Sequence, residues 1–383
     1  MTVPVLLDAA RTPFGRFGGS LRQWSTRELL ARPIRALLER HARLPTPDGV
    51  LLGQVLQAGH GQNPARLAAA AGGLSWTVPA VTVNNVCLAG LATVAEASRR
   101  IRLGEGEVYV VGGGDSMTRA AHAGLLRGDH GASVGLVDTL VVDGLRCGLT
   151  GQGMGELSEE ANAGLGVSRA VQDEIAARSQ QRAAAASRSG WFADEIVAFD
   201  ALRCDEGIRP ETSIDALAQL RPAFSPDGTI TAGNASQLSD GASVGILTSS
   251  NVADRLGVTP LARVVACAEV AGPDHTLHLK PAAAVRAGCE HAGLAVSDID
   301  LFEINEAFAG VVAASVDELS LPMDVVNVNG GAIALGHPLA GTGLRLVHTL
   351  ARELRRRGQR HGVAALCGGG GQGMAVVIEV TPG

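Results

Sequence analysis

Hydrophobic and polar positions alternate in short blocks along the first 115 residues. Apolar runs of strand length, rich in Val and Leu, are followed by longer stretches whose apolar residues recur at helical spacing. In chain order, these strands and helices are predicted at 3–7, 26–41, 49–57, 64–72, 78–83, 88–103 and 107–111. Strands that alternate with helices in this way predict βαβ units around a central sheet.

The pattern changes between about residues 115 and 240. Strand patterns become rare, a polar helix is predicted at 168–190, and the segments 209–213 and 220–224 are rich in loop formers. We interpret this region as an insertion that packs over one face of the first unit. A loop region of this length is usually functional.

The alternation returns after Gly241, with predicted strands at 244–247, 261–270 and 301–304 and a helix at 281–292. A further apolar run, Val325–Val328, predicts a short buried strand that leads into a glycine-rich turn.

His337 and Pro338 close that turn, and an amphipathic helix is predicted from about 339 to 357. A last strand at 363–366 ends at Cys367 and the glycines 368–371.

Both halves of the chain therefore run strand, reactive turn, long helix, strand and glycine cluster. Residues 48–55 take the place in the first half that residues 300–307 take in the second, and 110–117 resemble 365–374. We interpret this as an internal duplication. Two related α/β halves that face each other would bring Cys87 and Cys367 toward one cleft.

Composition narrows the class of protein. The chain has 383 residues, 46% of them hydrophobic and 18% charged, which indicates a globular protein with a large core and more than one core unit. A net charge of -6 argues against binding to nucleic acid or to a membrane surface. The N-terminus has no signal-peptide pattern and no apolar run has the length of a membrane span, so we expect a soluble cytoplasmic protein.

The six cysteines form no C-x-x-C pair, which disfavours a zinc or disulfide framework. The histidines outside the glycine-rich turn have no spacing typical of metal ligands, so no metal is predicted.

Cys87 lies between a predicted strand and a predicted helix. The positive end of a helix dipole lowers the pKa of a thiol and stabilises the nucleophilic thiolate. The alternative is a buried cysteine that acts as a small hydrophobic residue. His337 could be a general base for such a thiol or an oxyanion donor. Asn305 and Glu306 follow an apolar strand and could orient a water or a carbonyl.

The two glycine clusters, 112–114 and 368–371, do not match a nucleotide-binding loop. They suit a site where backbone N–H groups approach a thioester oxygen.

Several motifs together resemble the thiolase family, which comprises acetyl-CoA acetyltransferases and 3-ketoacyl-CoA thiolases. The resemblance covers essentially the whole chain. Its motifs are the segments 11–15, 61–66, 84–87, 221–224, 231–236, 305–309, 330–338 and 367–370.

The resemblance implies a thiolase fold, with duplicated αβα halves that form a five-layered αβαβα core. Residues 1–115 plus 244–258 would form the N-terminal half, 259–383 the C-terminal half, and 116–243 a loop domain that covers the coenzyme A site. It implies a ping-pong acyltransferase that makes or cleaves a 3-ketoacyl-CoA. Coenzyme A and acetyl-CoA would be substrates, no cofactor would be bound permanently, and the assembly would be a homodimer or a homotetramer.

The resemblance also implies roles for individual residues. Cys87 would carry the acyl group as a thioester, and Cys367 would be the acid or base at the α-carbon of acetyl-CoA. His337 would activate Cys87 and, with a water held by Asn305, form an oxyanion hole. Backbone N–H groups of Cys87 and Gly369 would form a second hole. The residues implied around coenzyme A are Leu145, Met154, Arg209, Phe224, Ala232, Ser236, Ala307 and Phe308.

Three departures from the family pattern concern the substrate side. Leu88 follows the nucleophile where a small residue is usual, and Gly153 stands where a histidine is usual. The segment 277–281 reads Leu-His-Leu-Lys-Pro instead of Met-Gly-x-Gly-Pro. We therefore expect a substrate preference that differs from simple acetoacetyl-CoA, with acyl chain length and reaction direction left open.

Two alternatives remain at this point. A ketoacyl synthase of related fold would need a histidine or an asparagine where Cys367 stands. A catalytically silent acyl-CoA or lipid-binding protein would tolerate loss of the reactive residues, yet all of them are present.

Overall fold

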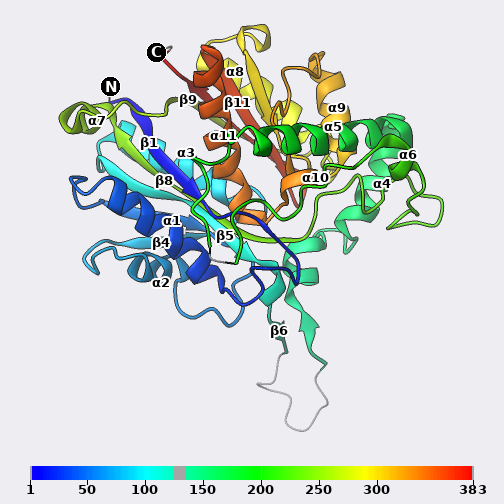
Figure 1. The fold of residues 1–383 in the computed structure, drawn as a ribbon, viewed down its shortest axis with the longest axis horizontal. Helices are drawn as coiled ribbons and strands as arrows, with labels where there is room; N and C mark the ends of the chain where they lie inside the picture. Colours follow the sequence, from blue (N-terminus) through cyan, green and yellow to red (C-terminus); the bar gives the residue numbers. More distant parts are fainter. Residues whose placement is uncertain (1, 125–134, 200, 382–383) are drawn as a thin grey trace.

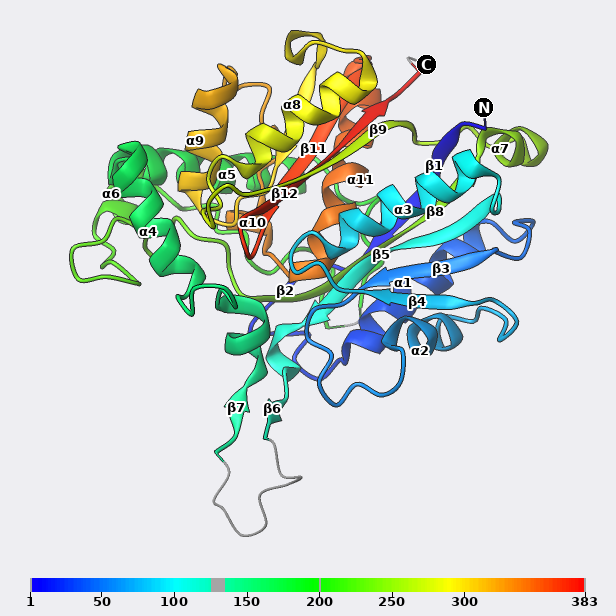
Figure 2. The same ribbon diagram turned by 180° about the vertical axis from the view of Figure 1, so that it is seen from behind.

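The computed structural model describes residues 2–124, 135–199 and 201–381. Ten strands form one mixed sheet in the order β10-β11-β12-β9-β1-β8-β5-β3-β4, and β2 pairs with β8 (Figures 1 and 2). The sheet is built from β1 (Pro4–Arg11), β2 (Gly15–Arg16), β3 (Gly49–Gly53), β4 (Ala80–Val83), β5 (Val108–Ser116), β8 (Ser239–Ser249), β9 (Ala262–Ala271), β10 (Leu301–Ile304), β11 (His361–Gly368) and β12 (Gln372–Glu379). A two-stranded sheet joins β6 (His122–Ala123) to β7 (Val137–Asp138).

The helices lie between these strands and in the long insertion. They are α1 (Thr26–Arg40), α2 (Pro64–Ala71), α3 (Ala89–Leu103), α4 (Met154–Leu165), α5 (Arg169–Arg188), α6 (Ile214–Ala218), α7 (Ser250–Leu256), α8 (Lys280–Ala292), α9 (Ala309–Leu319), α10 (Ala332–Leu335) and α11 (Thr342–Arg357). Short turns of other helix types are η1 (Met117–Arg119), η2 (Leu140–Leu145), η3 (Val296–Asp298) and η4 (Leu339–Gly341).

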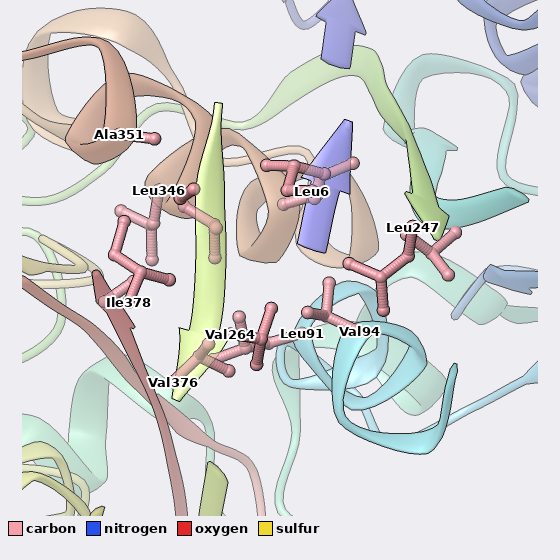
Figure 3. Packing of buried hydrophobic residues seen from close by; sticks show 14 of the residues in the cluster. Leu6, Leu91, Val94, Leu247, Val264, Leu346, Ala351, Val376 and Ile378 are labelled. Atoms are coloured by element: carbon pink, nitrogen blue, oxygen red, sulfur yellow. The ribbon is translucent and has the colours of Figure 1, made fainter. Parts of the chain in front are cut away.

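Three apolar clusters show that the molecule has five layers. α1 and α2 pack on the outer face of the N-terminal strands, and α8 and α9 pack on the outer face of the C-terminal strands. Between the two sets of strands, α3 and α11 share one core, in which Leu91 and Val94 of α3 lie near Leu6, Leu247 and strand residues of the other half (Figure 3). The predicted αβαβα fold class is confirmed.

The two halves repeat the same strand pairing. In the first half β3 is parallel to β5, and β5, β8 and β1 follow in antiparallel order. In the second half β10 is parallel to β11, and β11, β12 and β9 follow in antiparallel order. The halves join where β1 pairs with β9 at Val5↔Arg263 and Leu6↔Ala262. The duplication therefore places α3 and α11 at equivalent positions.

Two predictions about strands were wrong. Val325–Val328 forms no strand; Val326 makes a single parallel bridge to Phe302. The glycines 112–114 do not follow β5 but lie inside it, because the strand continues to Ser116 along β8. The helix predicted from about 339 to 357 is found as α11, whose first two turns are buried between the sheet halves and whose polar side is exposed at Arg356 and Arg357.

The central helices α3 and α11 meet at two glycines. A methyl group on Gly90 would lie 2.2 Å from Ala340 O, and one on Gly343 would lie 2.3 Å from Leu91 N. Only glycine permits this approach, which brings the start of α3 against the start of α11.

We expect Gly343→Ala to destabilise the protein by about 1–3 kcal/mol, because the added methyl group forces two backbones apart. Urea unfolding measures the change. Gly164→Ala is the matched control, because this helical glycine of α4 has no neighbour within 4 Å of the added atom. Equal unfolding midpoints for the two variants would contradict the prediction.

No helix within residues 2–124, 135–199 and 201–381 combines the length and the hydropathy that a membrane crossing requires.

Candidate active site

Cys87 lies in the turn between β4 and α3, two residues before the helix begins. The residue before it, Val86, has φ +47°. A β-branched residue rarely adopts this left-handed conformation, and such strain is concentrated at functional sites. The turn thus holds Cys87 at the N-terminal end of α3 through backbone geometry.

His337 lies in the equivalent turn of the second half, before η4 and α11. Its Nδ1 is 2.6 Å from Thr342 Oγ1, and its backbone N–H donates to Ser239 Oγ at 3.1 Å. Its Nε2 is buried and has no protein partner among the described residues. The Thr342 hydroxyl therefore fixes the ring and leaves Nε2 free for chemistry.

Cys367 lies inside β11, paired with Gly373 of β12, and not after the strand as the sequence predicted. Asn305 follows β10, the parallel neighbour of β11, and its backbone N–H donates to Ala365 O at 2.9 Å. The hairpin that joins β11 to β12 carries Gly369 and two glycines of positive φ, Gly370 and Gly371.

A small, mainly apolar cavity of about 60 Å³ brings these segments together. It is lined by Cys87, His337, Cys367 and Gly369 from the predicted catalytic set and by Leu145, Met154, Ser236, Ala307 and Phe308 from the predicted coenzyme A set. A wider groove of about 710 Å³ between α5 and α9 is lined by none of these residues. The smaller cavity is the candidate active site.

Four predicted site residues lie outside this lining. Asn305 is buried, and both atoms of its amide lack a protein partner in the described part of the chain. Phe224 is half-exposed and meets the Phe308 ring edge to face at 6.0 Å. Arg209 and Ala232 are exposed residues of the insertion.

Sequence reasoning missed several residues around the cavity. Gly144 and Leu339 line it, and Thr342 and Ser239 hold His337. The carboxylate of buried Asp115 accepts hydrogen bonds from the backbone N–H groups of Leu56 and of Ala340, the residue after the cavity residue Leu339. The one sequence signal for Asp115 is its position directly after the glycines of an apolar strand.

The departures on the substrate side have distinct locations. Leu277 lines the cavity, whereas Leu88 is buried in the central core and packs against Gly368. His278 is buried, with Nε2 2.8 Å from Asn162 Oδ1, and the Lys280 ammonium group donates to Asp274 at 3.0 Å. Gly153 is the N-cap of α4.

Burial governs the protonation states in the cavity. It raises the pKa of the Cys87 thiol to about 12, with a smaller contribution from Asp115. Burial and the neighbouring Cys87 likewise raise the pKa of Cys367 well above its usual value. The predicted lowering of the Cys87 pKa by the dipole of α3 was wrong, because loss of hydration outweighs the helix end.

The imidazole of His337 is neutral for the same reason. Burial, and next the charge of Arg345, lower the pKa of His337 to about 4. The resting cavity thus holds two thiols and a neutral base, and a thiolate forms only by proton transfer within the site.

We expect His337 to remain neutral from about pH 5.5 to about pH 8. Because the folded pKa lies below the unfolded value of 6.5, the contribution of this imidazole to stability is present above pH 6.5 and is lost as the pH falls toward 4. Ring nitrogen shifts in ¹⁵N NMR, assigned with a His337→Gln protein, measure the protonation state. A titration midpoint near 6.5 would contradict the assignment.

Fold and cavity together define a class of protein: a duplicated α/β enzyme-like scaffold whose halves meet at two thiols and an imidazole. The chain matches the family model of the thiolase N-terminal domain over residues 4–251 and that of the thiolase C-terminal domain over residues 258–380. It belongs to the thiolase family, and the resemblance predicted from the motifs is confirmed.

Relatives match over nearly their full length. A probable acetyl-CoA acetyltransferase of Mycobacterium leprae is 47% identical and covers 99% of this chain and 100% of its own. An acetyl-CoA acetyltransferase of Chromobacterium violaceum is 44% identical, with 98% of each chain covered. The crystal structure of the Bacillus anthracis acetyl-CoA acetyltransferase is similar with a TM-score of 0.94, 37% identity and 99% of each chain covered.

Proposed function

We propose that the protein is an acyl-CoA:acetyl-CoA C-acyltransferase, which interconverts two acyl-CoA thioesters with a 3-ketoacyl-CoA and free coenzyme A. The observation that carries this proposal is the meeting of Cys87, Cys367 and His337 in one small, mainly apolar cavity. Membership of the thiolase family and the names of the full-length relatives support the same reaction.

In the first half-reaction, Cys87 attacks the thioester carbonyl of an acyl-CoA while Nε2 of His337 takes the thiol proton. The bond from carbon to the Cys87 sulfur forms, and the bond to the coenzyme A sulfur breaks. The departing sulfur receives a proton from Cys367, so free coenzyme A leaves and a thiolate remains beside an imidazolium. The covalent thioester divides one difficult step into two easier ones.

In the second half-reaction, the Cys367 thiolate removes a proton from the α-carbon of acetyl-CoA. Because burial raises the pKa of Cys367, its thiolate is a strong base, as a weakly acidic C–H group requires. His337 and a water held by Asn305 stabilise the enolate oxygen. The α-carbon attacks the acyl thioester, and the Cys87 sulfur leaves with the proton of the imidazolium.

We further propose how coenzyme A is held. Met154, Ser236 and Phe308 would contact the pantetheine at the cavity, and Phe224 would extend this apolar contact outward. Arg209, exposed on the insertion, would bind a phosphate of the nucleotide. Coenzyme A is then a substrate that enters and leaves, and no cofactor is bound permanently.

We also propose that the protein is a cytoplasmic homodimer or homotetramer. β4 is an edge strand in the sheet order, and Val81 on it is 47% exposed, which supports a contact between copies of the chain. Light scattering of the purified protein at several concentrations tests the assembly.

Mixing the protein with acetyl-CoA distinguishes the enzyme from a silent acyl-CoA-binding protein. Intact-mass measurement should show one acetyl group on the chain, located at Cys87 by peptide mapping. An unmodified chain with bound acetyl-CoA would instead support the binding protein. A panel of 3-ketoacyl-CoA thioesters of increasing length then defines the substrate.

A further inference from the structure

A buried ion pair lies next to the candidate active site. Arg345, on the second turn of α11, has no exposed surface, and its Nη1 donates to Glu303 of β10 at 2.9 Å. The remaining donors, Nε and Nη2, are buried and have no protein partner among the described residues. Buried donors are nearly always hydrogen-bonded, so these two require a partner within the cluster.

Two proposed catalytic residues in the same region, Asn305 and His337, also have buried polar atoms without a protein partner in the described ranges. Asn305 follows Glu303 by two residues, so its side chain lies on the same face of the strand, toward α11. Both amide atoms of Asn305 and the Nε2 atom of His337 are buried without a protein partner in the described ranges. His337 is held by Thr342, which precedes Arg345 by three residues and therefore lies on the same side of α11.

We propose that Arg345 is a positioning residue for the reaction: its free N–H groups, through ordered water, orient the Asn305 amide toward the active site. A water that accepts from the guanidinium group donates to Asn305 Oδ1. The amide N–H groups of Asn305 then hold the second water, which donates to the enolate oxygen of the substrate. Ordered water is the usual partner of such buried groups. This inference rests on the roles proposed above for Asn305 and His337.

The charge of Arg345 acts on the same site. It lowers the pKa of the His337 imidazole in addition to the effect of burial. Other ionisable groups also face this region from every packed element; they are Glu303 and Glu306 after β10, Glu195 and Glu353 beyond them, Asp115 under η4, and the thiols Cys87 and Cys367. Arg345 also opposes the effect of burial on its partner Glu303, because burial raises the pKa of that carboxyl group to about 8 and the charge of Arg345 lowers it.

The experiment compares Arg345→Met and Arg345→Lys with Asn305→Ala in the full chain. Two rates are measured: acetylation of Cys87 by acetyl-CoA, and condensation at steady state. We expect Arg345→Met to lower the kcat of condensation roughly 10- to 100-fold, the effect of a misplaced catalytic group, with little change in acetylation. In the Asn305→Ala background the same substitution should change the rate less than about twofold, because the amide it orients is gone.

The pH profile separates positioning from a structural role. Removal of the positive charge raises the pKa of His337, so the acid limb of condensation moves to higher pH in Arg345→Met and stays in place in Arg345→Lys. Arg355→Met is the matched control; this arginine of the same helix donates to Pro260 O and should be dispensable.

Additive losses in the double variant, or an unmoved acid limb, would overturn the inference. If Arg345→Met does not fold, Arg345→Lys with and without Asn305→Ala carries the test, since it keeps the charge and loses the forked donors. If Asn305→Ala condenses at the wild-type rate, the proposed role of Asn305 fails. If Asn305→Ala is impaired and folded Arg345 variants are not, only the inference fails.

Discussion

The Cys87→Ala protein is expected to lose acyl transfer, with kcat reduced at least roughly 10⁴-fold in both directions. Alanine cannot form the thioester, and the cavity offers no second nucleophile in the same place. Cys367 also lines the cavity, but it lies inside β11 and faces the α-carbon in the proposed reaction. The remaining groups could still bind and polarise a thioester, which accounts for any residual rate.

Two measurements define this result. Thiolysis of a 3-ketoacyl-CoA gives the rate, and intact mass reports whether the chain still becomes acetylated. Cys204→Ala is the matched control, because Cys204 is an exposed free cysteine of the insertion. Near-normal turnover by Cys87→Ala would remove the nucleophile assignment while leaving the fold and the family unchanged.

Much of the fold was predictable because it is encoded locally. The helices at 26–41, 88–103 and 281–292 and the strands at 49–57 and 301–304 follow from apolar spacing, and each has a counterpart in the structure within a few residues. The duplication was also visible, since both halves repeat the same order of elements.

The predictions that failed all concern features that depend on tertiary contacts. Val326 pairs with Phe302 alone, although its neighbours have the composition of a strand. The equivalent strand of the first half, β4, extends over four residues beside β3. Glycine weakens the interior of a strand, yet β5 continues through Gly112 because it stays paired with β8, whose Ser243 O occupies the space that a side chain would need.

The candidate active site likewise has features that the sequence predicts and features that depend on tertiary contacts. Motifs identified Cys87, His337 and Cys367, and the cavity contains all three. The direction of the Cys87 pKa shift could not be inferred from sequence, because it depends on how deeply the assembled halves bury the thiol. The free amide of Asn305 and the buried charge of Arg345 likewise become visible only when β10 lies against α11.

Replacement of Cys367 by serine should separate the two half-reactions. A hydroxyl is a far weaker acid than a thiol, so Ser cannot supply the base that removes the α-proton of acetyl-CoA. We expect condensation to fall roughly 10³- to 10⁴-fold, whereas Cys87 and His337 remain in place and acetylation persists within about tenfold of the wild-type rate.

Exchange of the α-protons of acetyl-CoA in deuterated water measures the lost step directly, and mass measurement follows the step that remains. Cys289→Ser is the matched control, because Cys289 is a buried cysteine of α8 away from the cavity and the same atom is changed. It reports the stability cost of a buried hydroxyl without any change at the active site. Equal loss of acetylation and exchange in Cys367→Ser, with a fold as stable as that of Cys289→Ser, would contradict the prediction and show that departure of coenzyme A depends on the Cys367 proton as strongly as removal of the α-proton depends on the thiolate. Retained exchange would show that another group is the base, and His337 would then be the residue to replace.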